Sequence, residues 1–145
     1  MVAAGVALAM LWWWPLGGVK GWQRGEVWTA DVTAAEYLRR LATTVGEYGV
    51  SDEATPRQVE QELDTVLAGC DRLLAADHSP LEVVDRDWLR GKCEDWKKVF
   101  VAQRDRLRTN PGELKEVRKD FLDILTRLRT KLTERAAEID ARQTG

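Results

Sequence analysis

The chain has 145 residues, of which 44% are hydrophobic and 32% charged, and its formal net charge at neutral pH is −2. This composition excludes an intrinsically disordered chain and is sufficient for one domain with its own hydrophobic core. The near balance of charge gives no reason to expect a molecule-wide nucleic-acid surface. Two cysteines and one histidine are too few for a disulfide framework or an ordinary zinc site.

The first segment, residues 1–19, carries no charged side chain and contains three adjacent tryptophans. As a helix it would extend about 28 Å, close to the hydrocarbon core of a bilayer at about 30 Å. Tryptophan rings on all sides of one helix suit the boundary between lipid and water better than a protein core. We therefore expect residues 1–19 to be a transmembrane or membrane-inserted anchor.

Two other interpretations of this segment remain open. One is a secretory signal, but nothing basic precedes Lys20, and the candidate cleavage sites have Leu16 or Trp28 where a small residue is preferred. The other is an apolar helix that docks into a protein partner. The sequence favours the anchor over both.

Residues 20–31 form a tryptophan-containing linker between the anchor and the rest of the chain. Indole and cationic side chains favour the membrane interface. Within the preceding segment, small residues four positions apart would allow close packing between spans. The predicted interface residues are Trp12, Trp13, Trp14, Lys20, Trp22, Arg24 and Trp28. The predicted span-packing residues are Ala3, Gly5, Ala7 and Ala9. Because the positive charges follow the span, a single-pass protein with a cytoplasmic bundle is favoured.

Three stretches share one pattern that is typical of helix starts. Thr55-Pro56, Ser79-Pro80 and Asn110-Pro111 each place a capping side chain before proline, and Gln or Glu follows three positions after the cap. Thr33, with Glu36, is a weaker fourth start. Apolar residues at steps of three and four predict amphipathic helices over 32–48, 56–76, 80–108 and 111–141, the first closed by Gly49.

The short connections between these helices predict an all-α domain over residues 32–142. We expect either an up-down four-helix bundle, or a long helical hairpin with two shorter helices packed against it. Counting outward from the last turn places four aromatic residues in the core: Trp88, Trp96, Phe100 and Phe121. Trp88 and Trp96 are also the residues that would line a ligand pocket, if the bundle had one.

The same counting separates Cys70 and Cys93 by about 10 Å along the helices, which is too far for a disulfide. We therefore predict two free, buried thiols. His78 lies in a turn between Asp77 and Ser79, and we expect it to be solvated.

Charge is unevenly distributed along the chain, with an acidic excess in residues 30–83 and a basic excess in residues 84–145. This asymmetry favours packing of one part against the other. One end of the bundle is predicted to carry Asp77, Glu82, Asp85 and Asp87. The opposite end is a basic tip, either a solvated helix end or a docking surface for an acidic partner: Arg104, Arg106, Arg108, Lys115, Arg118 and Lys119.

The sequence contains no phosphate-binding loop, nucleophile elbow or paired metal-ligand motif. We therefore expect no catalytic residue, metal, cofactor or small-molecule substrate. The main hypothesis is a non-catalytic accessory, structural or assembly subunit of a membrane protein complex, respiratory or photosynthetic complexes being examples. Its partners would be the membrane and other transmembrane subunits. The alternative is a peripheral regulatory bundle whose basic tip binds an acidic protein or, with less support, nucleic acid.

Overall fold

The computed structural model describes residues 32–144, so the predicted anchor and linker lie outside the described residues. The described chain forms four α-helices and one short 3₁₀ helix, and it contains no strand. The helices are α3 (Ala34–Val45), α4 (Pro56–Ala75), α5 (Val83–Thr109) and α6 (Leu114–Thr144), with η1 (Pro111–Glu113) directly before α6. The predicted all-α class and helical bundle are confirmed.

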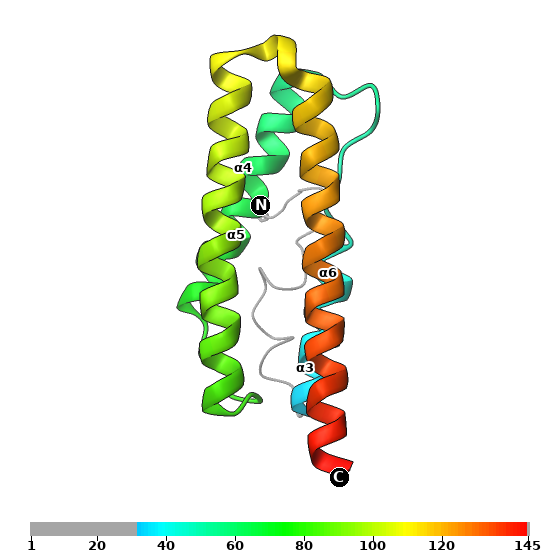
Figure 1. The fold of residues 1–145 in the computed structure, drawn as a ribbon. Coiled ribbons are helices and arrows are strands. Elements are labelled where there is room, and N and C mark those ends of the chain that lie inside the picture. Colours follow the sequence, from blue (N-terminus) through cyan, green and yellow to red (C-terminus); the bar gives the residue numbers. More distant parts are fainter. Residues whose placement is uncertain (1–31, 145) are drawn as a thin grey trace, which may run out of the picture.

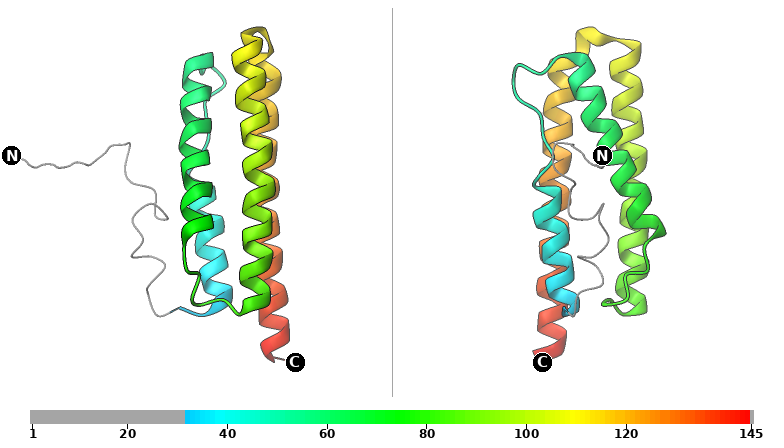
Figure 2. Two further views of the ribbon diagram at one scale, coloured as in Figure 1. Left: turned by 90° about the vertical axis from the view of Figure 1, so that its left-hand side faces the viewer. Right: turned by 180° about the vertical axis from the view of Figure 1, so that it is seen from behind.

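Helices α5 and α6 form a long antiparallel hairpin, and the two shorter helices lie on one side of it (Figure 1, Figure 2). The main packing partner of α3 is α6, whereas α4 packs along α5. This is the hairpin form of the two architectures that the sequence left open. Among residues 32–144, no helix has the length and apolar character that a membrane crossing requires.

Three of the predicted helix starts are confirmed by their hydrogen bonds. Thr55 Oγ1 accepts from the amide of Gln58, and the Gln58 side chain accepts from the amide of Thr55, which completes the capping box. Thr33 Oγ1 accepts from the amide of Glu36 in the same way. At the last start, Asn110 Oδ1 accepts from the amide of Gly112, and the first turn there is 3₁₀ rather than α.

The predicted start of α5 at Ser79-Pro80 is wrong. The helix begins at Val83, and its cap residue Glu82 makes no side-chain capping bond. Before Glu82 the chain makes a turn in which the amide of Leu81 donates to the carbonyl of His78. Leu81 is only 1% exposed, so burial of this side chain and of His78 takes precedence over the local capping signal.

The predicted end of the first helix at Gly49 is also wrong. Helix α3 ends at Val45 with Gly46 as its cap, and the amide of Gly46 donates to the carbonyl of Ala42. Tyr48 then turns into the core, where it is buried. Burial of this aromatic ring outside the helix ends α3 earlier than the glycine signal indicated.

The aromatic core is confirmed for two of its four predicted members. Phe100 and Phe121 are fully buried and meet edge to face across the hairpin, with ring centroids 5.9 Å apart. Trp88 and Trp96 are only partly buried and pack against the outside of the core, so the prediction holds for them in part.

Cys70 and Cys93 are free and buried, as the sequence predicted. Desolvation by burial raises the pKa of the Cys70 thiol to about 12 and raises the pKa of Cys93 as well. Both therefore remain neutral thiols at physiological pH, which is the state of inert core cysteines.

Candidate functional site

The basic tip lies where α5 turns into α6, and most of its predicted docking residues bind acidic side chains of this chain. Arg104 pairs with Asp64, Arg106 with Glu113 and Asp120, Arg108 with Glu60, and Lys119 with Asp123, at N–O distances of 2.6–2.9 Å. Lys115 and Arg118 make no ion pair within residues 32–144. The role of the tip in docking stays a prediction, and these last two cations are its available charges.

Three ion pairs run along the seam between α4 and α5. They join Glu60 to Arg108, Asp64 to Arg104, and Asp71 to Lys97. Each step forward along α4 is matched by an equal step back along α5, as an antiparallel register requires. Some of the acidic side chains before residue 84 thus pair with basic side chains after it, as the charge asymmetry indicated.

At the opposite end, where the sequence predicted Asp77, Glu82, Asp85 and Asp87, Asp85 is buried rather than a surface charge. It is 1% exposed, and its carboxylate accepts from Arg135 at 2.9–3.0 Å and from Arg142 at 2.7 Å. The Arg135 guanidinium also lies 5.1 Å from the centre of the Trp88 ring. A signal for this burial was present, because Asp85 precedes the buried Leu89 by four residues on the same helix face.

His78 is the clearest correction to the sequence analysis, which placed it in solvent. It is 2% exposed and adopts a left-handed backbone conformation with φ of 56°. Tyr37 Oη lies 2.5 Å from Nδ1, and Nε2 lies 2.6 Å from the Leu73 carbonyl oxygen. A polar residue in a turn usually faces water, but these two partners satisfy the ring inside the bundle.

Burial lowers the pKa of His78 from its ordinary value, and nearby Arg90 and Arg86 lower it further. The bond to the Leu73 carbonyl and the charge of Asp77 act in the opposite direction. Burial raises the pKa of the Tyr37 hydroxyl, with smaller contributions from Cys93 and Asp77. Both side chains are therefore held in their neutral forms.

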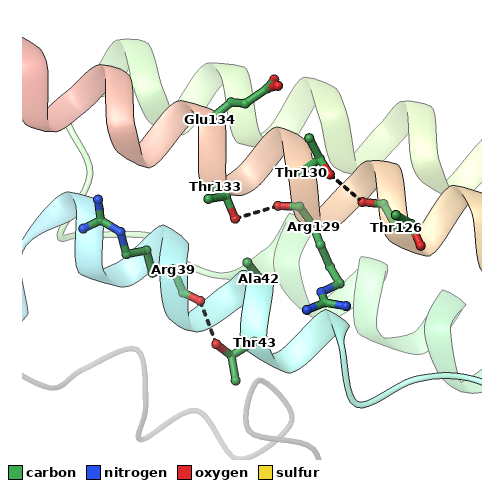
Figure 3. Close-up of a pocket in the computed structure, with 8 residues that line it drawn as sticks. All are labelled: Arg39, Ala42, Thr43, Thr126, Arg129, Thr130, Thr133 and Glu134. Atoms are coloured by element: carbon green, nitrogen blue, oxygen red, sulfur yellow. Dashed lines mark hydrogen bonds between the residues drawn. The ribbon is translucent and has the colours of Figure 1, made fainter.

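An open groove of about 460 Å³ lies between α3 and α6. Figure 3 shows Arg39 and Arg129 toward its two ends, with Ala42 between them. The hydroxyls of Thr43, Thr130 and Thr133 donate to backbone carbonyls four residues earlier, at 2.9–3.1 Å. Thr126 and Glu134 complete the lining. Of the two guanidinium groups, that of Arg39 is paired with Asp140.

Among residues 32–144, no group of three or more His, Cys, Asp or Glu side chains is placed to hold a metal ion. Comparisons with protein-family models, with curated proteins and with solved structures found no match for this chain. The functional interpretation therefore depends on the chemistry of its own residues.

Proposed function

We propose that this protein is a non-catalytic accessory or assembly subunit of a membrane protein complex. Residues 1–19 would be its single membrane anchor, residues 20–31 an interfacial linker, and the helical bundle its part outside the lipid. The observation that carries the proposal is an uncharged segment with three adjacent tryptophans, followed by a tryptophan-containing linker and then a well-packed bundle.

The placement of α3 supports this arrangement. Ala34, at the start of α3, lines one small pocket together with Glu82 and Arg142. The linker would therefore join the bundle at the end where α4 gives way to α5, and the hairpin turn would lie at the far end (Figure 1). With 27 residues, α5 is about 40 Å long, so the anchored bundle would present its tip well away from the anchor.

The use of the buried polar groups also supports a structural role. Both ring nitrogens of His78 are bound within the fold, and the Asp85 carboxylate is held by two arginines. A catalytic acid or base, by contrast, must itself lie within hydrogen-bond reach of the substrate. These titratable groups are thus engaged in joining elements of the bundle.

The alternative is a peripheral regulatory module that binds an acidic protein through the basic tip. The observation that favours it is a pocket at the tip in which Lys115 and Arg118 have no ion pair within the described chain. Its other lining residues are Asp52, Leu122 and the paired Lys119 and Asp123. Nucleic acid is disfavoured, since the neighbouring cations are already neutralised by acids of the same chain.

Membrane extraction distinguishes the two proposals. An anchored protein should stay with membranes through high salt and alkaline carbonate and should be released by detergent. Leu8→Arg, which places a charge within the segment, should shift the protein to the soluble fraction, because a central arginine costs about 2.5–3.5 kcal/mol of insertion free energy. Ala68→Arg, on an exposed position of α4, is the matched control and should stay with membranes.

Release of the wild-type protein by salt alone would contradict the anchor and support the peripheral module. In that case, the double substitution Lys115→Glu with Arg118→Glu should release the protein from membranes. The same pair of substitutions should leave an anchored protein in the membrane. Purification in a mild detergent, with identification of the proteins that co-purify, then tests membership of a complex. An anchored protein that purifies alone would contradict the accessory-subunit proposal.

A further inference from the structure

The side of α5 that faces away from α4 carries a stripe of partly exposed side chains, and no helix of residues 32–144 lies beyond it (Figure 2). It is on the opposite side of the helix from Lys97, Arg104 and Arg108, which pair with acids of α4. Its members follow one another at steps of three and four, so they share one face. This α5 stripe consists of Val84, Trp88, Gly91, Lys92, Asp95 and Val99.

The apolar members of the stripe are unusually exposed for this fold. Val84 is 54% and Val99 36% exposed, and they are two of the three large exposed hydrophobic side chains among residues 32–144. Trp88 lies between them in the chain and is only partly buried, against the Arg135 guanidinium. Apolar side chains gathered on one exposed helix face favour contact with another protein surface.

Gly91 lies within this stripe, and the described fold gives no reason for a glycine there. A glycine inside a helix is less stable than an alanine at the same position. A Cβ added at Gly91 would meet no other atom within 4 Å, so the single chain has room for a side chain. The absence of a side chain would instead allow a second helix to approach α5 closely at this point.

The charges of the stripe specify what kind of helix that would be. Lys92 and Asp95 form no ion pair within residues 32–144. They lie at equal distances on either side of the midpoint between residues 93 and 94, and so do Trp88 and Val99. About this midpoint, an antiparallel second α5 would place its Asp95 opposite Lys92 and its Val99 opposite Trp88. A parallel second α5 would place each charge beside its own copy, which is unfavourable.

We propose that the α5 stripe binds the same stripe of a second copy of this chain, in an antiparallel two-fold contact centred between residues 93 and 94. Such a contact is isologous, so both the ion pair and the Trp88–Val99 contact occur twice. The proposal goes beyond the proposed function and does not depend on it.

The contact is compatible with two anchors in one membrane. Each α5 begins at Val83, close to the end of the bundle where residues 20–31 would join, and the two starts would lie about 30 Å apart along the paired helices. Residues 20–31 can extend to about 40 Å. Both chains of the dimer could therefore reach the same bilayer.

Sedimentation of the full-length protein in a mild detergent, corrected for bound detergent, measures the association. We expect a monomer–dimer equilibrium with a dissociation constant of about 1–100 μM, because a single helix pair is a small interface. Residues 1–19 could also associate in detergent, so substitutions in α5 must decide where the contact lies.

Charge exchange tests the pairing and its direction. Lys92→Asp and Asp95→Lys should each weaken the dimer at least about tenfold, because each places like charges opposite one another. The double substitution restores opposite charges and should return the dissociation constant to within about threefold of wild type. Arg57→Glu, exposed on α4 away from the stripe, is the matched control and should leave it unchanged.

Gly91→Leu tests the close approach. The leucine fits a single chain, so the thermal unfolding temperature should not fall, but it would separate two paired helices. We expect the dissociation constant to rise at least about tenfold.

Three results would overturn the proposal. The first is a protein that stays monomeric at about 100 μM, whether or not it binds other proteins. The second is a dimer that is unaffected by the single charge reversals, which would place the contact elsewhere. The third is a double charge exchange that does not restore association. Membrane extraction tests the anchor separately, so failure of one proposal leaves the other standing.

Discussion

The carboxylate of Asp85 and the guanidinium of Arg135 meet across the open end of the α5–α6 hairpin, fifty positions apart in the chain. Asp85 Oδ1 lies 3.0 Å from Nε and 2.9 Å from Nη2 of Arg135, while Arg142 binds the other carboxylate oxygen. This fork fixes the end of the hairpin that has no covalent turn. The same guanidinium covers Trp88, so one side chain joins an ion pair to the aromatic edge of the core.

Replacement of Asp85 by asparagine should therefore destabilise the bundle. We expect a loss of about 2–4 kcal/mol in the free energy of unfolding, because two arginines lose their counter-ion at a buried carboxylate position. Denaturant unfolding measures the loss. Asp123→Asn breaks an exposed pair with Lys119 one helical turn away and is the matched control. Equal effects of the two substitutions would mean that the buried pair contributes no more than a surface one.

The contact between Phe100 and Phe121 should be among the most sensitive points of the core. Phe100→Ala should cost about 3–5 kcal/mol of stability, since both rings are fully buried. The double variant with Phe121→Ala should be less destabilised than the sum of the single variants by about 0.5–1.5 kcal/mol. Val99→Ala, at a half-exposed position next to Phe100, should change stability by less than about 0.5 kcal/mol. If the stability losses of the two single variants simply add in the double variant, the rings do not interact.

Cys70 and Cys93 should be unreactive in the folded protein. The burial that raises the pKa of Cys70 from 9.0 to about 12 lowers its thiolate fraction at about pH 8 by roughly three orders of magnitude. A thiol reagent should therefore modify neither residue quickly in the native state, and both in unreduced, denatured protein. Ala102→Cys, exposed on α5, provides a rapidly reacting control. Rapid native labelling of the wild type, or the absence of free thiols after denaturation, would contradict the prediction.

Stability should also fall on mild acidification because of His78. Its pKa is lowered in the folded state, so the unfolded chain binds more protons in the interval between the two pKa values. The free energy of unfolding should thus be highest above the ordinary histidine pKa of 6.5 and should decrease below it, by at most about 1.4 kcal/mol per pH unit.

Chemical unfolding at a series of pH values measures this slope. His78→Asn, which keeps a residue suited to the left-handed conformation, should remove the slope between about pH 6.5 and pH 5. The pKa of Glu113 is also lowered in the folded state, but this carboxyl affects stability only at pH values below its ordinary pKa of 4.5. A wild-type protein with constant stability between about pH 7 and pH 5 would contradict the prediction.

Much of the helical architecture could be predicted from local sequence. The capping box at Thr55, the cap at Thr33 and the start at Asn110 depend on contacts within one or two helical turns, which a sequence displays directly. The same is true of the three- and four-residue apolar steps. The pairing of Phe100 with Phe121 could be located as well, because the turn at Asn110 fixes their levels on two adjoining helices.

The two helix ends that were wrongly placed are positions where tertiary burial opposes a local signal. Ser79 is a residue type that favours a helix cap and Gly49 one that favours a helix stop, yet the nearby Leu81 and Tyr48 are buried in the core. His78 follows the same rule, since nothing near it in the chain indicates that Tyr37 will reach its ring from another helix.

The sequence by itself therefore determined the all-α class, four helical segments, two unpaired thiols and the aromatic pair of the hairpin, because each follows from periodicity, capping or counting along neighbouring helices. Only the tertiary structure decided that α3 packs on α6, that Asp85 is buried between two arginines, and that most cations of the basic tip are paired internally. The physical reason is that burial and ion pairing depend on which faces meet, and residues 40 or more positions apart meet only once the helices have packed.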